Sequence, residues 1–214
     1  MTSIGAGRVV IIAFDGIVAD TLPLRAKALA DAIARECTVL DITVGAVELQ
    51  AMLLPRLPGR TLQECATAAV TELPVLQHER LRHDLTAHDL IAMRAQNAWS
   101  ATVAHGIPLR EGVGLRIATM VARGVRVVMR SDSHRREVEP ILRLASLEDS
   151  TLFVRCADDL PHRAGVTSLR ASFEAIDTRL ERQRLPREQR DAVEVADGTA
   201  AFALGFSATS RTAL

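Results

Sequence analysis

The chain has 214 residues, which is enough to bury one substantial hydrophobic core, or one core and a smaller accessory domain. Its 48% hydrophobic and 24% charged residues are typical of a globular protein and exclude a disordered chain. The formal net charge is zero, so electrostatics give no reason to expect binding to nucleic acid or to an acidic membrane surface. Lys27 is the only lysine, so any cation that a site needs must come from arginine.

The cysteines and the lengths of the apolar runs indicate in which cellular compartment the protein is expected. Cys37, Cys65 and Cys156 are irregularly spaced, which predicts buried free thiols in a reducing environment. No apolar run reaches the length of about 18 residues that a transmembrane helix needs. Asp15 interrupts the first hydrophobic stretch, which argues against a secretory signal peptide. We therefore expect a cytoplasmic protein that does not insert into a membrane.

The first half of the chain predicts one strand followed by helices. Residues 9–14 are an apolar run typical of a buried strand, and Pro23 stands where a helix to about Cys37 would begin. The residues from there to about Gly106 contain three segments with helical spacing, at 47–54, 61–73 and 86–103. In the last segment one apolar stripe contains Ala87, Ile91, Ala95, Ala98 and Ala101. About 70 residues of helix exceed what a parallel crossover requires, so we expect residues 21–106 to form a separate helical domain.

After residue 106, helices and strands alternate. We expect, in chain order, a helix at 112–123, a strand at 125–129, a helix at 134–145, a strand at 152–154, a helix from Thr167 or Ser168 to Pro186, a strand at 192–195 and a short helix at 200–204. Such alternation predicts a parallel sheet with helices on both faces. The predicted fold is therefore α/β, with a Rossmannoid core made of residues 1–20 and 107–214.

The sequence AFDGIVADT, residues 13–21, overlaps the end of the first predicted strand. It resembles the first motif of the haloacid dehalogenase (HAD) superfamily, in which a hydrophobic strand ends in Asp-x-Asp-Gly and a short segment then ends in Asp-Thr or Asp-Ser. Asp15, Gly16, Asp20 and Thr21 match, whereas Ala13 stands at the family's first aspartate. The resemblance is to the phosphatase and β-phosphoglucomutase branch, and it implies a HAD-like core with an inserted α-helical cap.

The resemblance also implies a chemistry for this motif. In the family, the first aspartate attacks phosphorus and the second acts as the acid and base. Because residues i and i+2 of an extended chain point the same way, both would face one pocket. Asp15 would be the acid/base residue and would ligate Mg²⁺ through its backbone carbonyl. Ala13 can supply neither the nucleophile nor a metal ligand, and losing a nucleophile typically costs about 10⁴ to 10⁶ in rate.

The second and third family motifs match less closely. Ser131, at the end of the second predicted strand, would hydrogen-bond a phosphate oxygen, with Asp132 at an electropositive helix start. A simpler alternative, compatible with this role, is that Ser131 or Ser133 caps the helix. Arg163 would neutralise the phosphate and the nucleophile, and Arg170 is the alternative.

The fourth motif and the cap loop are weaker matches. Glu194 or Asp197 would hold the metal together with Asp15, but both lie closer to the following Ala-rich segment than the family pattern requires. In the predicted cap, residues 57–61 resemble a loop that family members turn toward the substrate. Arg60 would then be a specificity residue, and the alternative is an exposed arginine at a helix start.

Two classes of function follow from Ala13. The chain resembles a Mg²⁺-dependent phosphohydrolase for a small phosphorylated metabolite, impaired at its nucleophile, as an engineered Asp-to-Ala variant would be. Alternatively, it is a natural pseudoenzyme that serves as a non-catalytic binding subunit for a ligand or a protein partner. The least favoured route is direct attack by water, with Asp15 as the general base.

Overall fold

The computed structural model describes residues 8–159, 168–185 and 190–193. These residues divide into two compact units. One unit runs to Asp20 and resumes at Ile107, and the other spans Thr21–Gly106. Each unit is built from its own elements.

The first unit contains a four-stranded parallel sheet, which confirms the α/β prediction. The strands are β1 (Val9–Ala13), β2 (Arg126–Arg130), β3 (Phe153–Arg155) and β4 (Arg190–Val193), in the order β3-β2-β1-β4. Every residue of β1 is buried, as expected for a central strand of a parallel sheet that is covered on both faces.

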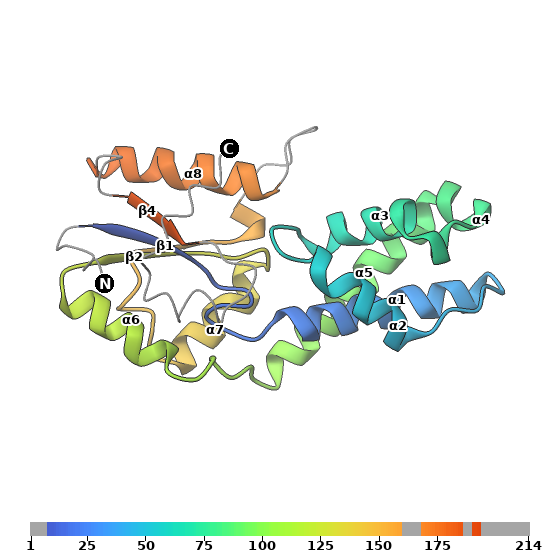
Figure 1. Cartoon of the computed structure of the whole chain (residues 1–214), viewed down its shortest axis with the longest axis horizontal. Coiled ribbons are helices and arrows are strands. Elements are labelled where there is room, and N and C mark those ends of the chain that lie inside the picture. The colour runs from blue at the N-terminus through green and yellow to red at the C-terminus, as the bar shows by residue number, and fades with distance from the viewer. Residues whose placement is uncertain (1–7, 160–167, 186–189, 194–214) are drawn as a thin grey trace. The chain divides into compact units, whose positions relative to one another are not determined.

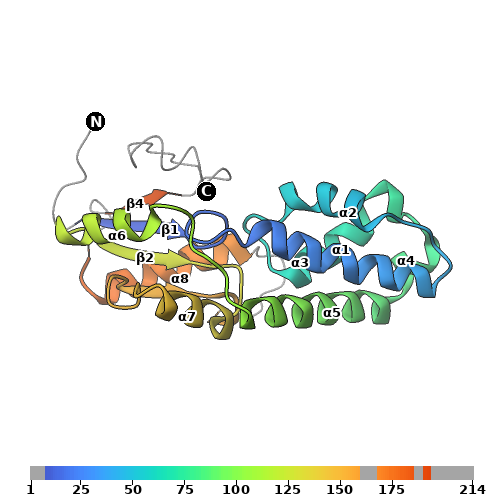
Figure 2. The same ribbon diagram turned by 90° about the horizontal axis from the view of Figure 1, so that it is seen from below.

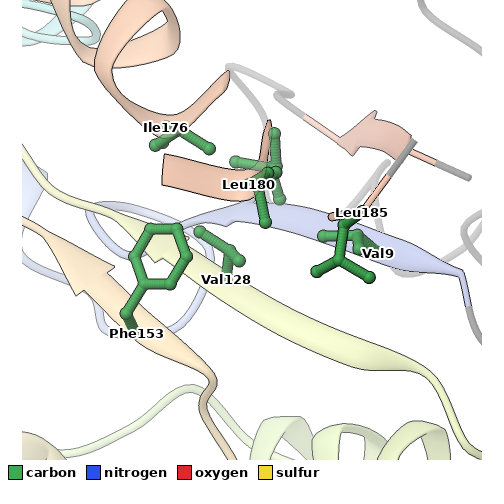
Figure 3. Close-up of a cluster of buried hydrophobic side chains, with 7 residues drawn as sticks. Val9, Val128, Phe153, Ile176, Leu180 and Leu185 are labelled. Carbon is green, nitrogen blue, oxygen red and sulfur yellow. The ribbon is translucent and has the colours of Figure 1, made fainter. Parts of the chain in front are cut away.

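Helices cover both faces of this sheet (Figure 1). Helix α8 (Ser168–Arg182) lies on one side, and α6 (Val113–Ala122) and α7 (Arg135–Leu144) lie on the other. Side chains alternate along a strand, so the two apolar sets of β1 serve different helices. Figure 3 shows the cluster under α8, formed by Val9, Ile11, Val128, Phe153, Ile176, Leu180 and Leu185.

The second unit is helical throughout, and no strand occurs in its described residues, 21–106. Its helices are α1 (Leu22–Val39), α2 (Ala46–Leu53), α3 (Leu62–Glu72), α4 (Glu79–His83) and α5 (Leu85–Ala104). Short 3-10 turns at Leu54–Arg56 and Pro74–Leu76 connect them, and a third, Ala157–Asp159, lies in the first unit. Helices α1 and α5 lie side by side (Figure 2). A capping box between Thr61 and Glu64 starts α3.

The expected apolar stripe on α5 is wrong at its carboxyl half. Ala98 and Ala101 are exposed, whereas Trp99 and Val103 are buried. Burying an indole and a valine removes far more apolar area from water than burying two methyl groups. The buried face therefore shifts toward the larger side chains, by one position at Trp99 and by two at Val103.

Strand limits also differ slightly from the sequence-based expectation. Strands β2 and β3 each run one residue later than expected, and β4 begins at Arg190, before the apolar residues that suggested it. Strand ends follow the ladder: β4 pairs with Val9–Ile12 of β1 over its whole length. The expected helix at 200–204 lies outside the described residues. In the part of the chain that the structure describes, none of the helices is long and apolar enough to span a membrane.

We expect all three cysteines to resist modification in the native protein. Each is a buried thiol that forms no disulfide, and burial raises the pKa of the Cys37 and Cys156 thiols. Since the thiolate is the reactive form, Ellman's reagent at pH 8 should label the native chain slowly and label all three thiols in guanidinium chloride. Rapid stoichiometric labelling of a thiol in the native protein would contradict this burial.

Candidate functional site at the carboxyl edge of the sheet

The candidate site lies where β1 and β2 end beside each other. The two strands are parallel neighbours, so Asp15, which follows β1, meets the loop of Ser131 to Ser133, which follows β2. Two backbone hydrogen bonds hold the strand ends in place: the Phe14 N–H donates to the Arg130 carbonyl at 2.7 Å, and the Ser131 N–H donates to the Arg155 carbonyl at 2.8 Å. The loop after β2 is thus fixed between β1 and β3.

The Asp15 carboxylate accepts three hydrogen bonds from this loop. Its Oδ2 accepts from the Ser131 hydroxyl at 2.6 Å and from the Asp132 backbone N–H at 2.8 Å. Its Oδ1 accepts from the Ser133 hydroxyl at 3.2 Å. Asp15 is buried, and so are the three loop residues. Both oxygens of a buried carboxylate are therefore held by hydroxyl and amide donors, which offsets the cost of removing the charge from water.

A tight turn presents Asp15 to the loop. Gly16 adopts φ +80°, a conformation that glycine accepts without steric cost, and its N–H donates to the Ala19 carbonyl at 2.9 Å. The Val18 and Ala19 N–H groups both donate to the Phe14 carbonyl. The turn is thereby closed on itself, so the position of the Asp15 backbone does not depend on a ligand.

Ser131 is oriented by the loop and does not cap the helix. The Ser133 N–H donates to the Ser131 hydroxyl oxygen at 3.1 Å, which leaves the Ser131 proton directed at Asp15. The N-cap of α7 is His134, whose N–H donates to Glu137 at 3.0 Å. The N-cap alternative for Ser131 or Ser133 is therefore wrong.

Arg130 is a buried site residue to which the sequence analysis gave no role. Its guanidinium pairs with Asp132 at 2.5 Å, both side chains are 3% exposed, and it lies 5.9 Å from the centroid of the Phe173 ring on α8. Ala13, Arg130 and Arg155 are aligned in register across β1, β2 and β3. The signal for it in the sequence is an arginine that directly follows the three apolar residues of β2, which reads RVVMR.

The loop after β3 is braced by a second ion-pair network. Arg135 donates to both carboxylate oxygens of Asp159, and this hydrogen bonding to Asp159 raises the pKa of Arg135. Arg155 donates to the Asp159 carbonyl, and burial lowers the pKa of Arg155. The Ala157 N–H donates to the Ser133 carbonyl at 3.0 Å, which links this network to the loop after β2.

Comparison with solved structures identifies the fold. The chain is similar to a predicted phosphoglycolate phosphatase from Haemophilus somnus, with a TM-score of 0.64 and 12% identity over 96% of this chain and 84% of that one. A haloacid dehalogenase-like hydrolase from Bacteroides fragilis has a TM-score of 0.61 and 16% identity over 92% and 83% of the two chains. CbbY from Rhodobacter sphaeroides, solved with phosphate, has a TM-score of 0.57 and 18% identity over 90% and 83%. The chain has the haloacid dehalogenase fold. No protein-family model and no curated protein matches its sequence.

In this HAD fold, the described residues do not form a magnesium site. The Ala13 side chain has no oxygen to offer a metal ion, which leaves the backbone carbonyl of Asp15 as the one expected ligand at the end of β1. No group of three His, Cys, Asp or Glu residues within the described ranges could hold a metal ion.

The site described above does not include four other expected site residues. Arg163, Glu194 and Asp197 fall outside the described residues. Arg60 belongs to the helical unit, where it precedes the N-cap of α3 and its carbonyl accepts a hydrogen bond from the buried Arg25 at 2.9 Å. Its side chain is half-buried, so the expectation of an exposed arginine is wrong, while the expectation of a helix start is confirmed.

Proposed function

We propose that this HAD-fold protein binds a small phosphorylated metabolite at the carboxyl edge of its sheet and does not hydrolyse it. The observation that supports this is the loop of Ser131 to Ser133, whose donors already hold an anion. The Ser131 hydroxyl and the Asp132 N–H converge on one carboxylate oxygen, at 2.6 and 2.8 Å. Hydroxyl and amide donors that converge on one oxygen are the means by which proteins hold phosphoryl groups.

The absence of turnover follows from Ala13. Phosphoryl transfer through an enzyme intermediate needs a nucleophile at the end of β1, and an alanine side chain cannot act as one. Ser131 is a poor substitute because it is 1% exposed and its oxygen already accepts the Ser133 N–H. Asp15 would then hold the loop after β2 in place, without acid/base catalysis.

The remaining parts of the proposal extend the resemblance to the rest of the chain. The helical unit of residues 21–106 would act as the cap, with Arg60 contacting the ligand beyond its phosphoryl group. Arg163 would supply a cation to the phosphoryl oxygens, a role that suits a chain with a single lysine. Glu194 and Asp197 would matter only if Mg²⁺ binds, and we propose that ligand binding does not require it.

We expect the full chain to show no Mg²⁺-dependent hydrolysis of small phosphate esters above the buffer rate. Calorimetric titration with the same esters should nevertheless detect binding, and Ser131→Ala should weaken it. Ser150→Ala is the matched control because Ser150 precedes β3 at the opposite, amino-terminal edge of the sheet. Turnover that survives repurification and disappears in Asp15→Asn would refute the proposal in favour of direct attack by water. Failure of every ester to bind would also refute it.

A further inference from the structure

We propose that the Asp15 carboxylate is the resident occupant of this anion site, and that a phosphoryl group binds only by displacing it. This inference rests on the proposed function, since it assumes that the loop after β2 accepts phosphate. It adds a competition within the protein itself: Asp15 and the ligand use the same donors. The affinity for phosphate then depends on how much more favourably the donors of the loop hold the phosphoryl group than the Asp15 carboxylate.

The hydrogen bonds leave little donor capacity for a second anion. The Ser131 hydroxyl has one proton, and it is directed at Asp15 Oδ2. The Asp132 N–H donates to the same oxygen, and the Ser133 hydroxyl donates to the other. A phosphoryl oxygen that approached these donors would meet the carboxylate, whose negative charge and volume both oppose it.

The local charges also favour exchange over joint occupancy. Arg130, the buried cation next to Ser131 in the chain, is already paired with Asp132. A phosphoryl dianion beside Asp15 and Asp132 would therefore add to existing negative charge without a new partner from Arg130. Moving the Asp15 carboxylate away from the donors removes one of these charges from the site.

The backbone around Asp15 allows the exchange to be a side-chain movement. The turn after β1 is closed by the hydrogen bonds of Gly16, Val18 and Ala19, and the loop after β2 is tied to both neighbouring strands. Neither segment needs to move when the carboxylate rotates about its side-chain torsions. The site is thus preformed, and the cost of opening it includes the loss of the hydrogen bonds that the loop after β2 donates to Asp15.

The test compares phosphate binding by the unaltered chain, Asp15→Ala and Asp15→Asn. Inorganic phosphate and a simple phosphomonoester are the probes, titrated in chloride buffer of matched ionic strength with EDTA present. We expect Asp15→Ala to bind inorganic phosphate at least about tenfold more tightly, because phosphate then meets donors that lack a partner. Asp15→Asn keeps the size of the side chain but loses the charge and one acceptor oxygen, so its affinity for phosphate should fall between those of the unaltered chain and Asp15→Ala. It also provides a second test if the alanine variant misfolds.

Thermal melts supply an independent readout. Without phosphate, Asp15→Ala should melt below the unaltered chain because three buried donors lose their acceptor, and phosphate should raise its melting temperature more than that of the unaltered chain. Ser131→Ala in the Asp15→Ala background should remove the gain, and a gain that persists would place the phosphate elsewhere and overturn the inference.

The possible failures separate the inference from the proposed function. If the unaltered chain binds phosphate as tightly as Asp15→Ala and Ser131→Ala abolishes that binding, the displacement inference is wrong and the proposed function stands. If none of the variants binds phosphate or the ester, the loop is not a phosphoryl site and both are wrong. If the ester binds more tightly than inorganic phosphate, the phosphoryl group recognised by the site is that of a metabolite. Asp15 would still have to leave the donors for the ester to bind.

Discussion

Replacement of Arg130 by methionine should lower the free energy of unfolding by about 3–5 kcal/mol. Asp132 would lose the guanidinium that neutralises it at 2.5 Å, and it would remain charged at 3% exposure. The contact of Arg130 with the Phe173 ring would be lost as well. Urea denaturation followed by circular dichroism measures the change, and a loss of less than about 1 kcal/mol would show that the pair is solvated in solution.

Two further variants make this experiment specific. Arg143→Met breaks the pair with Glu148, whose side chains are 70% and 46% exposed, and should change stability by no more than about 0.5 kcal/mol. In the double variant Arg130→Met with Asp132→Leu, both charges are gone, so most of the stability should return. Equal losses in the single and double variants would instead indicate that packing, and not the buried charge, accounts for the effect.

Ala13→Asp should destabilise the chain by roughly 1–3 kcal/mol and should not create a Mg²⁺-dependent phosphatase. Ala13 is 7% exposed, so the new carboxylate would be placed in a nearly closed position. Arg130 lies in register beside it but is held by Asp132, and the donors of the loop after β2 are held by Asp15. Thermal melts and a phosphate ester screen, each with and without Mg²⁺, test both halves of this expectation.

Ala13→Asn is the matched control for that variant, because it adds nearly the same volume without the charge. If asparagine costs as much as aspartate, the loss comes from crowding at the end of β1. Hydrolysis that appears with aspartate, requires Mg²⁺ and falls again in Ser131→Ala would overturn the proposal of binding without turnover. The chain would then be an otherwise intact phosphohydrolase that lacks only its nucleophile.

Local patterns predicted the elements of the sheet well. Strand β1 was recognisable because five consecutive apolar residues can be buried on both faces only inside a covered parallel sheet. The alternation of helices and strands after residue 106 then predicted the parallel order, which the pairing of β1 with β2 and β4 confirms. These features depend on periodicity within short segments, so a single sequence is enough to find them.

Features that depend on contact between segments were predicted less well. On α5, the sequence suggested a buried stripe that ends in Ala98 and Ala101, whereas the fold buries Trp99 instead. Arg130 looked like an ordinary residue between a strand and a turn. Its importance depends on the register that sets it beside Ala13 and on the Phe173 ring, which lies on a helix more than a hundred residues after β1.

The sequence by itself determined the α/β class, the turn at Asp15–Gly16 and the missing carboxylate at Ala13, because each of these features depends on residues that are close together in the sequence. The tertiary structure decided what Asp15 does with its charge. Asp15 and Ser131 are 116 positions apart, and only the parallel pairing of β1 with β2 brings the carboxylate to the hydroxyl and amide donors that hold it. A buried carboxylate takes the donors that folding places within reach, and no local pattern records which donors those will be.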